Sequence, residues 1–227
     1  MMVRGVRIRV SLAAVLVLLA LAPVVQSRAQ SSASSSSSSK RGKKSAAGES
    51  GPDAGIVNDG VYRNATFGFS YKIPEGWVLR TEEMNTDGGT TEGGCPHTCS
   101  TVLLAVFSRP PEATGQEVNS SILIAAESAA AYPGLKEAAQ YFGPVTEVAK
   151  AQGFTVDQDP YEIALGSKAL VRSDFHKDVG TRVMRQSTLV MLSHGYAVSI
   201  TVISGTEDGV EDLIDGLEFT ETPKKTN

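Results

Sequence analysis

Cysteine, tryptophan and long hydrophobic runs are all scarce in this chain of 227 residues. It has two cysteines and one tryptophan, and aromatic residues make up 6% of it. Two cysteines can form at most one intramolecular disulfide, which excludes a disulfide-rich scaffold. The longest apolar run, Leu12 to Val25, is shorter than the roughly 20 residues that a transmembrane helix requires. We therefore do not expect an integral membrane protein, provided that the N-terminal segment is cleaved.

Motifs of common enzyme classes are also missing. No serine stands in a Gly-x-Ser-x-Gly elbow, and no acidic stretch has the ligand spacing of a calcium loop. We interpret the acidic groups Glu82-Glu83 and Asp174 to Asp178 as solvated surface. His176, expected to end a strand, and His194, expected in a turn, are interpreted as structural or exposed. The sequence thus predicts no catalytic residue, no metal site and no cofactor.

The first thirty residues have the layout of a secretory signal peptide. Arginines at positions 4, 7 and 9 precede the apolar run, and Ser27-Arg28-Ala29 places small residues at the minus-three and minus-one positions of a cut before Gln30. We predict a cleaved signal peptide over residues 1–29 and a secreted or periplasmic protein. An uncleaved membrane anchor is the alternative.

Residues 30–54 contain little that a folded domain could bury. An unbroken serine run from Ser34 to Ser39 leads into the basic cluster Lys40-Arg41-Gly42-Lys43-Lys44. Segments of this composition form flexible linkers, so we predict a disordered linker here. The basic cluster is interpreted as part of a solvated spacer.

The charge of the remaining chain is strongly negative. Residues 55–222 contain 11 Lys and Arg against 23 Asp and Glu, a formal charge of −12, although the whole chain carries only −4. An acidic domain repels polyanions, which argues against a nucleic-acid partner. A protein or a component of the cell envelope is the expected partner, and the sequence does not indicate an oligomeric state.

Strands dominate the single domain predicted over residues 55–222. Alternation of apolar and polar residues, continuous apolar runs and turn residues predict these elements. The expected strands are 61–65, 69–73 (ended by Pro74), 101–108 and 120–127, followed by the hairpins 161–165/168–176 and 181–193/196–203, the second joined by His194-Gly195. Trp77 is expected to fill the core beside the second strand.

Helical spacing appears in two segments. Apolar residues recur every three or four positions over 135–152, where Gly143-Pro144 predicts a kink or two short helices, with Pro144 opening the second. Val210, Leu213, Ile214 and Leu217 predict a short amphipathic helix that closes the domain before Phe219 and a polar tail over residues 223–227. The glycine-rich residues 86–94 are expected to form a mobile loop.

Antiparallel strands with inserted helices define an α+β domain. The segment Tyr62, Phe67-Gly68-Phe69-Ser70-Tyr71, Ile73-Pro74, Gly76-Trp77 resembles the opening motif of PsbP-like domains, the family of the extrinsic photosystem II protein, and Val210 to Phe219 resembles their closing helix. The resemblance implies an antiparallel β-sheet sandwiched between helices, the fold shared with a nuclear import factor that binds Ran. It also implies a non-enzymatic role in binding, scaffolding or assembly. The matching positions are packing positions, so no functional residue is transferred, and nothing here supports a role in photosynthesis.

The two cysteines lie in Cys95-Pro96-His97-Thr98-Cys99. A thioredoxin-type redox site requires two residues between its cysteines, whereas here there are three. Cys95, His97 and Cys99 could bind copper or zinc if the segment is extended. The Cα atoms of the two cysteines would then lie about 13 Å apart. A disulfide requires about 7 Å or less, so the two states exclude each other. Because export favours oxidation, we predict a Cys95–Cys99 disulfide at the base of the glycine-rich loop. A periplasmic metal-binding or thiol-redox protein is the alternative function.

Overall fold

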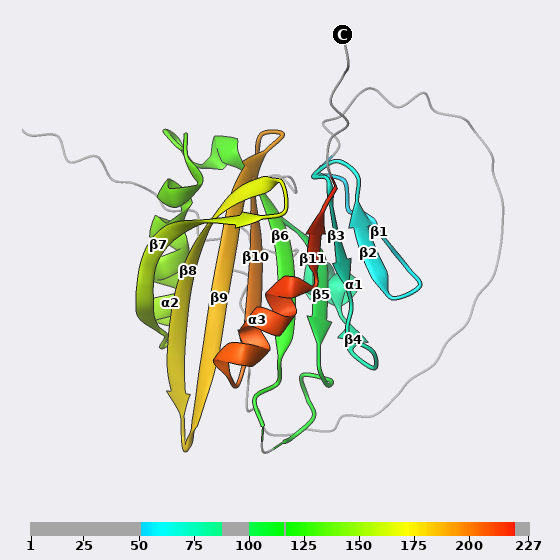
Figure 1. Cartoon of the computed structure of the whole chain (residues 1–227), viewed down its shortest axis with the longest axis vertical. Helices are drawn as coiled ribbons and strands as arrows, with labels where there is room; N and C mark the ends of the chain where they lie inside the picture. Colours follow the sequence, from blue (N-terminus) through cyan, green and yellow to red (C-terminus); the bar gives the residue numbers. More distant parts are fainter. Residues whose placement is uncertain (1–50, 88–99, 116, 221–227) are drawn as a thin grey trace, which may run out of the picture. The chain divides into compact units, whose positions relative to one another are not determined.

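The computed structural model describes residues 51–87, 100–115 and 117–220, whose strands form two antiparallel sheets (Figure 1). The seven-stranded sheet has the order β4-β5-β6-β10-β9-β8-β7, and the four-stranded sheet has the order β1-β2-β3-β11. The larger sheet consists of β4 (Val78–Leu79), β5 (Ser100–Phe107), β6 (Ser121–Ser128), β7 (Thr155–Leu165), β8 (Lys168–Val179), β9 (Arg182–Ser193) and β10 (Tyr196–Ser204). The smaller sheet consists of β1 (Ile56–Asn58), β2 (Val61–Asn64), β3 (Phe69–Lys72) and β11 (Leu217–Phe219).

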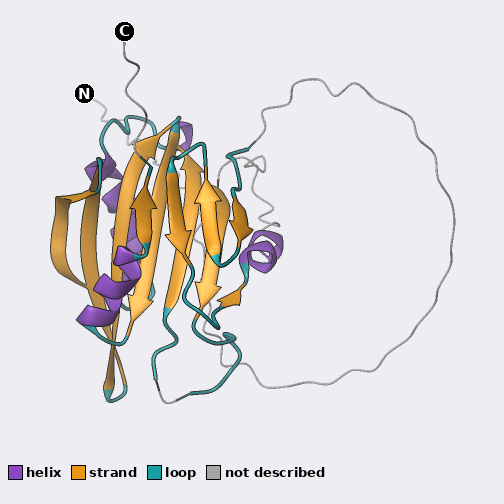
Figure 2. Ribbon diagram, turned by 45° about the vertical axis from the view of Figure 1, so that its right-hand side comes forward, coloured by secondary structure: helices purple, strands orange, loops and turns teal. Residues whose placement is uncertain are grey.

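The helical segments of the described chain are short. They are α1 (Thr81–Asp87), α2 (Phe142–Ala151) and α3 (Glu207–Asp215), with the 3-10 turns η1 (Ala129–Ala131) and η2 (Ala138–Tyr141). Figure 2 shows them lying against the strands, which make up most of the described domain. The antiparallel α+β class predicted from the sequence is confirmed.

The larger sheet buries both of its faces. On one face its apolar side chains pack with those of the smaller sheet and α3 in the main core, and on the other they pack with η2, α2 and α1 in three smaller clusters. Strand β10 shows why: Val198, Ile200 and Val202 point into the main core, while Ala197 points the other way. One outer layer is therefore a second sheet with a single helix, rather than helices alone.

The aromatic stretch predicted to open the domain supplies much of the main core. Tyr62, Phe67, Phe69 and Tyr71 are each at most 2% exposed. The ring of Phe67 meets that of Tyr196 edge-on at 5.9 Å, which joins the smaller sheet to β10. Trp77 is only half-buried at the margin of this core. Strand β3 ends at Lys72, one residue before the predicted end at Ile73.

The last third of the chain follows the sequence prediction most closely. The two-residue turns Gly166-Ser167 and His194-Gly195 join β7 to β8 and β9 to β10. His194 has the left-handed φ of 52° that its place in a tight turn predicts. Strand β8 does not end at His176, however. It continues to Val179 because His176 to Val179 pair with Arg182 to Arg185 of β9.

Several boundaries differ from the prediction for local physical reasons. Residues Thr86 and Asp87 belong to α1, not to a loop, and the hydroxyl of Thr86 donates to the carbonyl of Glu82 one turn earlier. Residues 135–137 are not helical. Helix α2 begins at Phe142, so Pro144 lies in its first turn, where no intrahelical donor is lost. Strands β1, β4 and β11, of two or three residues each, were not predicted.

Candidate binding surface

The residues singled out from the sequence are not brought together. Cys95, His97 and Cys99 lie outside the described residues, so the disulfide stays a prediction. His176 pairs with Asp157 of the neighbouring strand β7, and His194 contacts the hydroxyl of Ser193 at the far turn. Within residues 51–87, 100–115 and 117–220, no group of three His, Cys, Asp or Glu could hold a metal ion.

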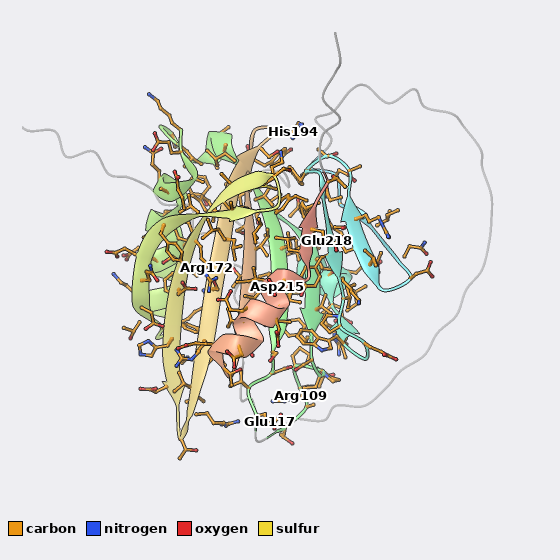
Figure 3. All side chains as sticks on the ribbon, in the orientation of Figure 1. Arg109, Glu117, Arg172, His194, Asp215 and Glu218 are labelled. Carbon is orange, nitrogen blue, oxygen red and sulfur yellow. The ribbon has the colours of Figure 1, made fainter. Side chains whose placement is uncertain are left out.

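A cluster of charged side chains surrounds Arg172 on β8 (labelled in Figure 3). Its guanidinium donates hydrogen bonds to Asp174 at 2.9 Å and to both carboxylate oxygens of Glu211, on α3, at 3.0 and 2.5 Å. Asp174 also accepts from the hydroxyl of Tyr161 at 2.8 Å. Asp174 is thus a partly buried partner in an ion network, and the interpretation as solvated surface was wrong for this residue.

The network fixes its own protonation states. Burial and the carboxylate of Asp174 raise the pKa of Tyr161 to about 12, so its hydroxyl remains a donor. Burial opposes the charge of Arg172, but hydrogen bonds to Glu211 and Asp174 outweigh it and raise the pKa of the guanidinium. Together with the pair Arg185–Glu207 at 3.0 Å, these contacts attach α3 to the larger sheet. The arrangement is a structural clamp.

A second polar cluster lies on the opposite face of the larger sheet. Glu127, near the end of β6, accepts a hydrogen bond from the hydroxyl of Tyr132, and the ring of Tyr132 meets that of Tyr141 edge-on at 5.2 Å. Burial raises the pKa of Glu127, although hydrogen bonds from Tyr132 and Tyr141 partly offset this effect. This cluster ties the connection between β6 and α2 to the sheet.

The exposed large apolar side chains of the described residues have a different distribution. They are Ile56 (67% exposed), Val57 (44%) and Leu79 (48%). All three belong to edge strands, β1 of the smaller sheet and β4 of the larger sheet, which lie on the same side of the view in Figure 1. Exposed apolar side chains on a free sheet edge are a feature of edges that pair with another chain.

Strand β1 is held firmly although all its residues are exposed. The hydroxyl of Tyr62 donates to the carbonyl of Ala54 at 3.0 Å, and the side-chain amide of Asn64 donates to the carbonyl of Asp53 at 2.7 Å. Asp53 accepts from the Gly55 amide and from the Thr66 hydroxyl, each at 3.0 Å. The edge is therefore ordered by side chains at its entrance and does not depend on apolar burial.

Glycine is required at the entrance to β1. Gly55 has a φ of 70°, and a Cβ there would lie 2.6 Å from the carbonyl oxygen of Arg63 and from the hydroxyl of Tyr62. The close approach brings the chain against β2 just before Ile56. The sequence analysis missed this hairpin, although Asp59-Gly60 is a dipeptide typical of a two-residue turn.

Strand β7, at the end of the larger sheet opposite β4, has features that protect sheet edges in natural proteins. Strand β7 contains Pro160 and the exposed acids Asp157 and Asp159, and its pairing with β8 shifts register twice. A proline, charges and bulges all discourage edge-to-edge pairing. Ile56 to Asn58 has none of these features. The two edges thus differ in their capacity to accept another strand.

None of the described helices has the length and apolar character needed to cross a membrane. No family model and no curated protein matches the chain. It is similar to the solution structure of cyanobacterial PsbP from Synechocystis, with 13% identity over 78% of this chain and 98% of that chain and a TM-score of 0.43. It is also similar to the Ran-binding protein Mog1p of Saccharomyces cerevisiae, with 11% identity over 68% and 91% of the two chains and a TM-score of 0.38.

A third similar structure is LpqN of Mycobacterium tuberculosis, described as involved in cell envelope biogenesis. It is 15% identical over 67% of this chain and 83% of that chain, with a TM-score of 0.34. The similar solved structures thus include a PsbP and a Ran-binding protein, the two kinds of protein to which the sequence analysis pointed.

Proposed function

We propose that this chain is an exported, non-enzymatic binding or scaffold domain whose partner is a protein, free in the exported compartment or part of the cell envelope. The observation that carries the proposal is the placement of the exposed side chains of Ile56, Val57 and Leu79 on the edge strands β1 and β4. The charged clusters around Arg172 and Glu127 instead serve internal contacts. The exposed apolar edges are what the domain offers to another molecule.

The rest of the chain fits this role. A signal peptide over residues 1–29 directs export, and the linker over residues 30–54 tethers the domain of residues 55–222, which the tail of residues 223–227 follows. Hydrogen bonds hold the last linker residues, Asp53 and Ala54, against β2, so the flexible part ends before them. A flexible chain of this length has a root-mean-square span of about 25–30 Å, enough to let the domain search a nearby surface. The Cys95–Cys99 disulfide, which the sequence predicts, closes a small ring.

Site-specific photo-cross-linking tests the function directly. A photoreactive residue replaces Ile56 or Leu79 on the apolar edges, and a matched control replaces Glu162, an exposed residue of the protected strand β7. We expect one discrete protein adduct from the exported fraction at positions 56 or 79 and none at 162. No adduct at either edge, or the same adducts at all three positions, would contradict the proposal.

A further inference from the structure

We propose that the partner adds an extended segment to the free edge of β1 as an antiparallel strand, and that this segment has an apolar residue opposite Val57 with Lys or Arg on both sides. The proposal rests on the protein-binding function proposed above and names the surface and the chemistry of its partner. It follows from the hydrogen-bond geometry of β1, its exposed side chains and the charges beside it.

The turn between β1 and β2 determines which backbone groups of β1 are free. Asp59 and Gly60 have φ values of 49° and 71°, and they join the paired residues Asn58 and Val61. In a two-residue turn of this kind the closing pair is hydrogen-bonded, and hydrogen-bonded pairs then alternate along the ladder. The N–H and C=O of Asn58 and Ile56 therefore face β2, whereas those of Val57 face the open side.

An antiparallel strand is the natural partner of such a residue. A residue of the added strand exchanges both hydrogen bonds with Val57 in a single pair. Successive side chains of β1 point to opposite faces, so an added strand also covers the exposed sides of Ile56 and Val57. Backbone pairing gives the affinity in this mode of recognition, and the flanking side chains give the selectivity.

The charges at the two ends of β1 favour a basic segment over a second copy of this chain, whereas Arg63 of β2, which pairs with Ile56, lies beside the middle of the strand. Asp53 precedes the strand and Asp59 follows it, and the Gly55 amide and the Thr66 hydroxyl lower the pKa of Asp53, which keeps it ionised. Two copies paired around Val57 would bring these acids together from both chains, within domains that each carry −12. Like charges close together across an antiparallel pair are destabilising. Lys or Arg at the ends of an added strand, opposite Ala54 and Gly60, would lie next to Asp53 and Asp59 in sequence register and is stabilising.

A proline substitution isolates the backbone contribution. Val57→Pro removes the outward N–H but leaves the ladder between β1 and β2 intact, because proline is tolerated on an edge strand when its nitrogen faces solvent. Val57→Thr is the matched control, since it keeps the N–H and has a similar shape. Asp59→Asn removes one flanking charge and retains a residue that tolerates the left-handed turn.

The probe is the capped synthetic peptide Lys-Val-Thr-Val-Thr-Val-Lys, titrated into the full exported chain and its three variants by calorimetry. We expect saturable binding to the natural chain and to Val57→Thr. Binding to Val57→Pro should be about fivefold weaker, because one hydrogen bond is lost and each contributes about 1 kcal/mol. Asp59→Asn should weaken binding about two- to fivefold. Added salt should also weaken binding to the natural chain, because it screens the charges. Thermal unfolding verifies that each variant is folded.

Four results would overturn the proposal. The natural chain does not bind the peptide, or Val57→Pro binds it as well as Val57→Thr does. Alternatively, sedimentation shows a dimer that Val57→Pro abolishes, and the occupant of the edge is then a second copy. If Val57→Pro still cross-links to the protein captured at position 79, strand addition to β1 is wrong while the binding function stands.

Discussion

The clamp between α3 and the larger sheet should show two unequal coupling energies. Arg172 is 13% exposed and has two acidic partners, Asp174 at 21% and Glu211 at 54% exposure. Exposed ion pairs contribute about 0.2–1 kcal/mol, and breaking a buried pair costs about 3–5 kcal/mol. The half-exposed Glu211 belongs near the first range, so we expect a coupling of about 0.5–1 kcal/mol with Arg172. For the more buried Asp174 we expect about 1.5–2 kcal/mol, between the two ranges.

Two double-mutant cycles measure these couplings by urea denaturation. One combines Arg172→Met with Glu211→Gln, and the other combines it with Asp174→Asn. Salt at 0.5 M should reduce the coupling of the Glu211 pair by more than half and that of the Asp174 pair by less, since salt screens exposed charges more effectively. Equal couplings, or a larger and salt-insensitive coupling for Glu211, would refute the argument from burial.

Three further predictions concern other parts of the domain. Tyr71→Phe should lower the free energy of unfolding by about 1–3 kcal/mol, because the Tyr71 hydroxyl donates to the Leu213 carbonyl at 2.9 Å and that buried acceptor would lose its partner; an unchanged urea midpoint would contradict this. Burial raises the pKa of Glu127, so its contribution to stability is fully present below the unfolded pKa of about 4.3 and is lost as the pH rises through the folded value. Glu127→Gln should flatten that slope in unfolding curves measured from pH 4 to pH 8, and an identical slope would count against it. Alkylation followed by intact-mass measurement should label Cys95 and Cys99 only after reduction; labelling without reductant, together with bound copper or zinc, would favour the metal alternative.

The sequence predicted the hairpins of the last third because their signals are local and strong. Val198, Ile200 and Val202 alternate with small or polar residues, and His194-Gly195 marks the turn. The aromatic stretch from Phe67 to Tyr71 gave the position of β3 for the same reason. In both segments the apolar residues alternate along the strand, and the structure buries these same residues.

The short edge strands could not be predicted in the same way. β1 and β4 have no buried residue, so they lack the apolar alternation that marks a strand. Their conformation depends on partners elsewhere in the chain, such as the Asn64 amide that fixes Asp53. The Arg172 clamp was missed as well, because Glu211 is 39 residues away and only the folded sheet brings it to Arg172.

Hydrogen exchange at the Val57 amide is the most direct test of strand addition at β1. In the free chain this N–H faces the open side of the sheet and should exchange rapidly, whereas the inward amides of Ile56 and Asn58 should be protected. Saturation with the Lys-Val-Thr-Val-Thr-Val-Lys peptide should slow exchange at Val57 at least about tenfold and leave Asn58 nearly unchanged. An amide of Val57 that still exchanges rapidly in the saturated complex would show that the partner segment does not pair with β1.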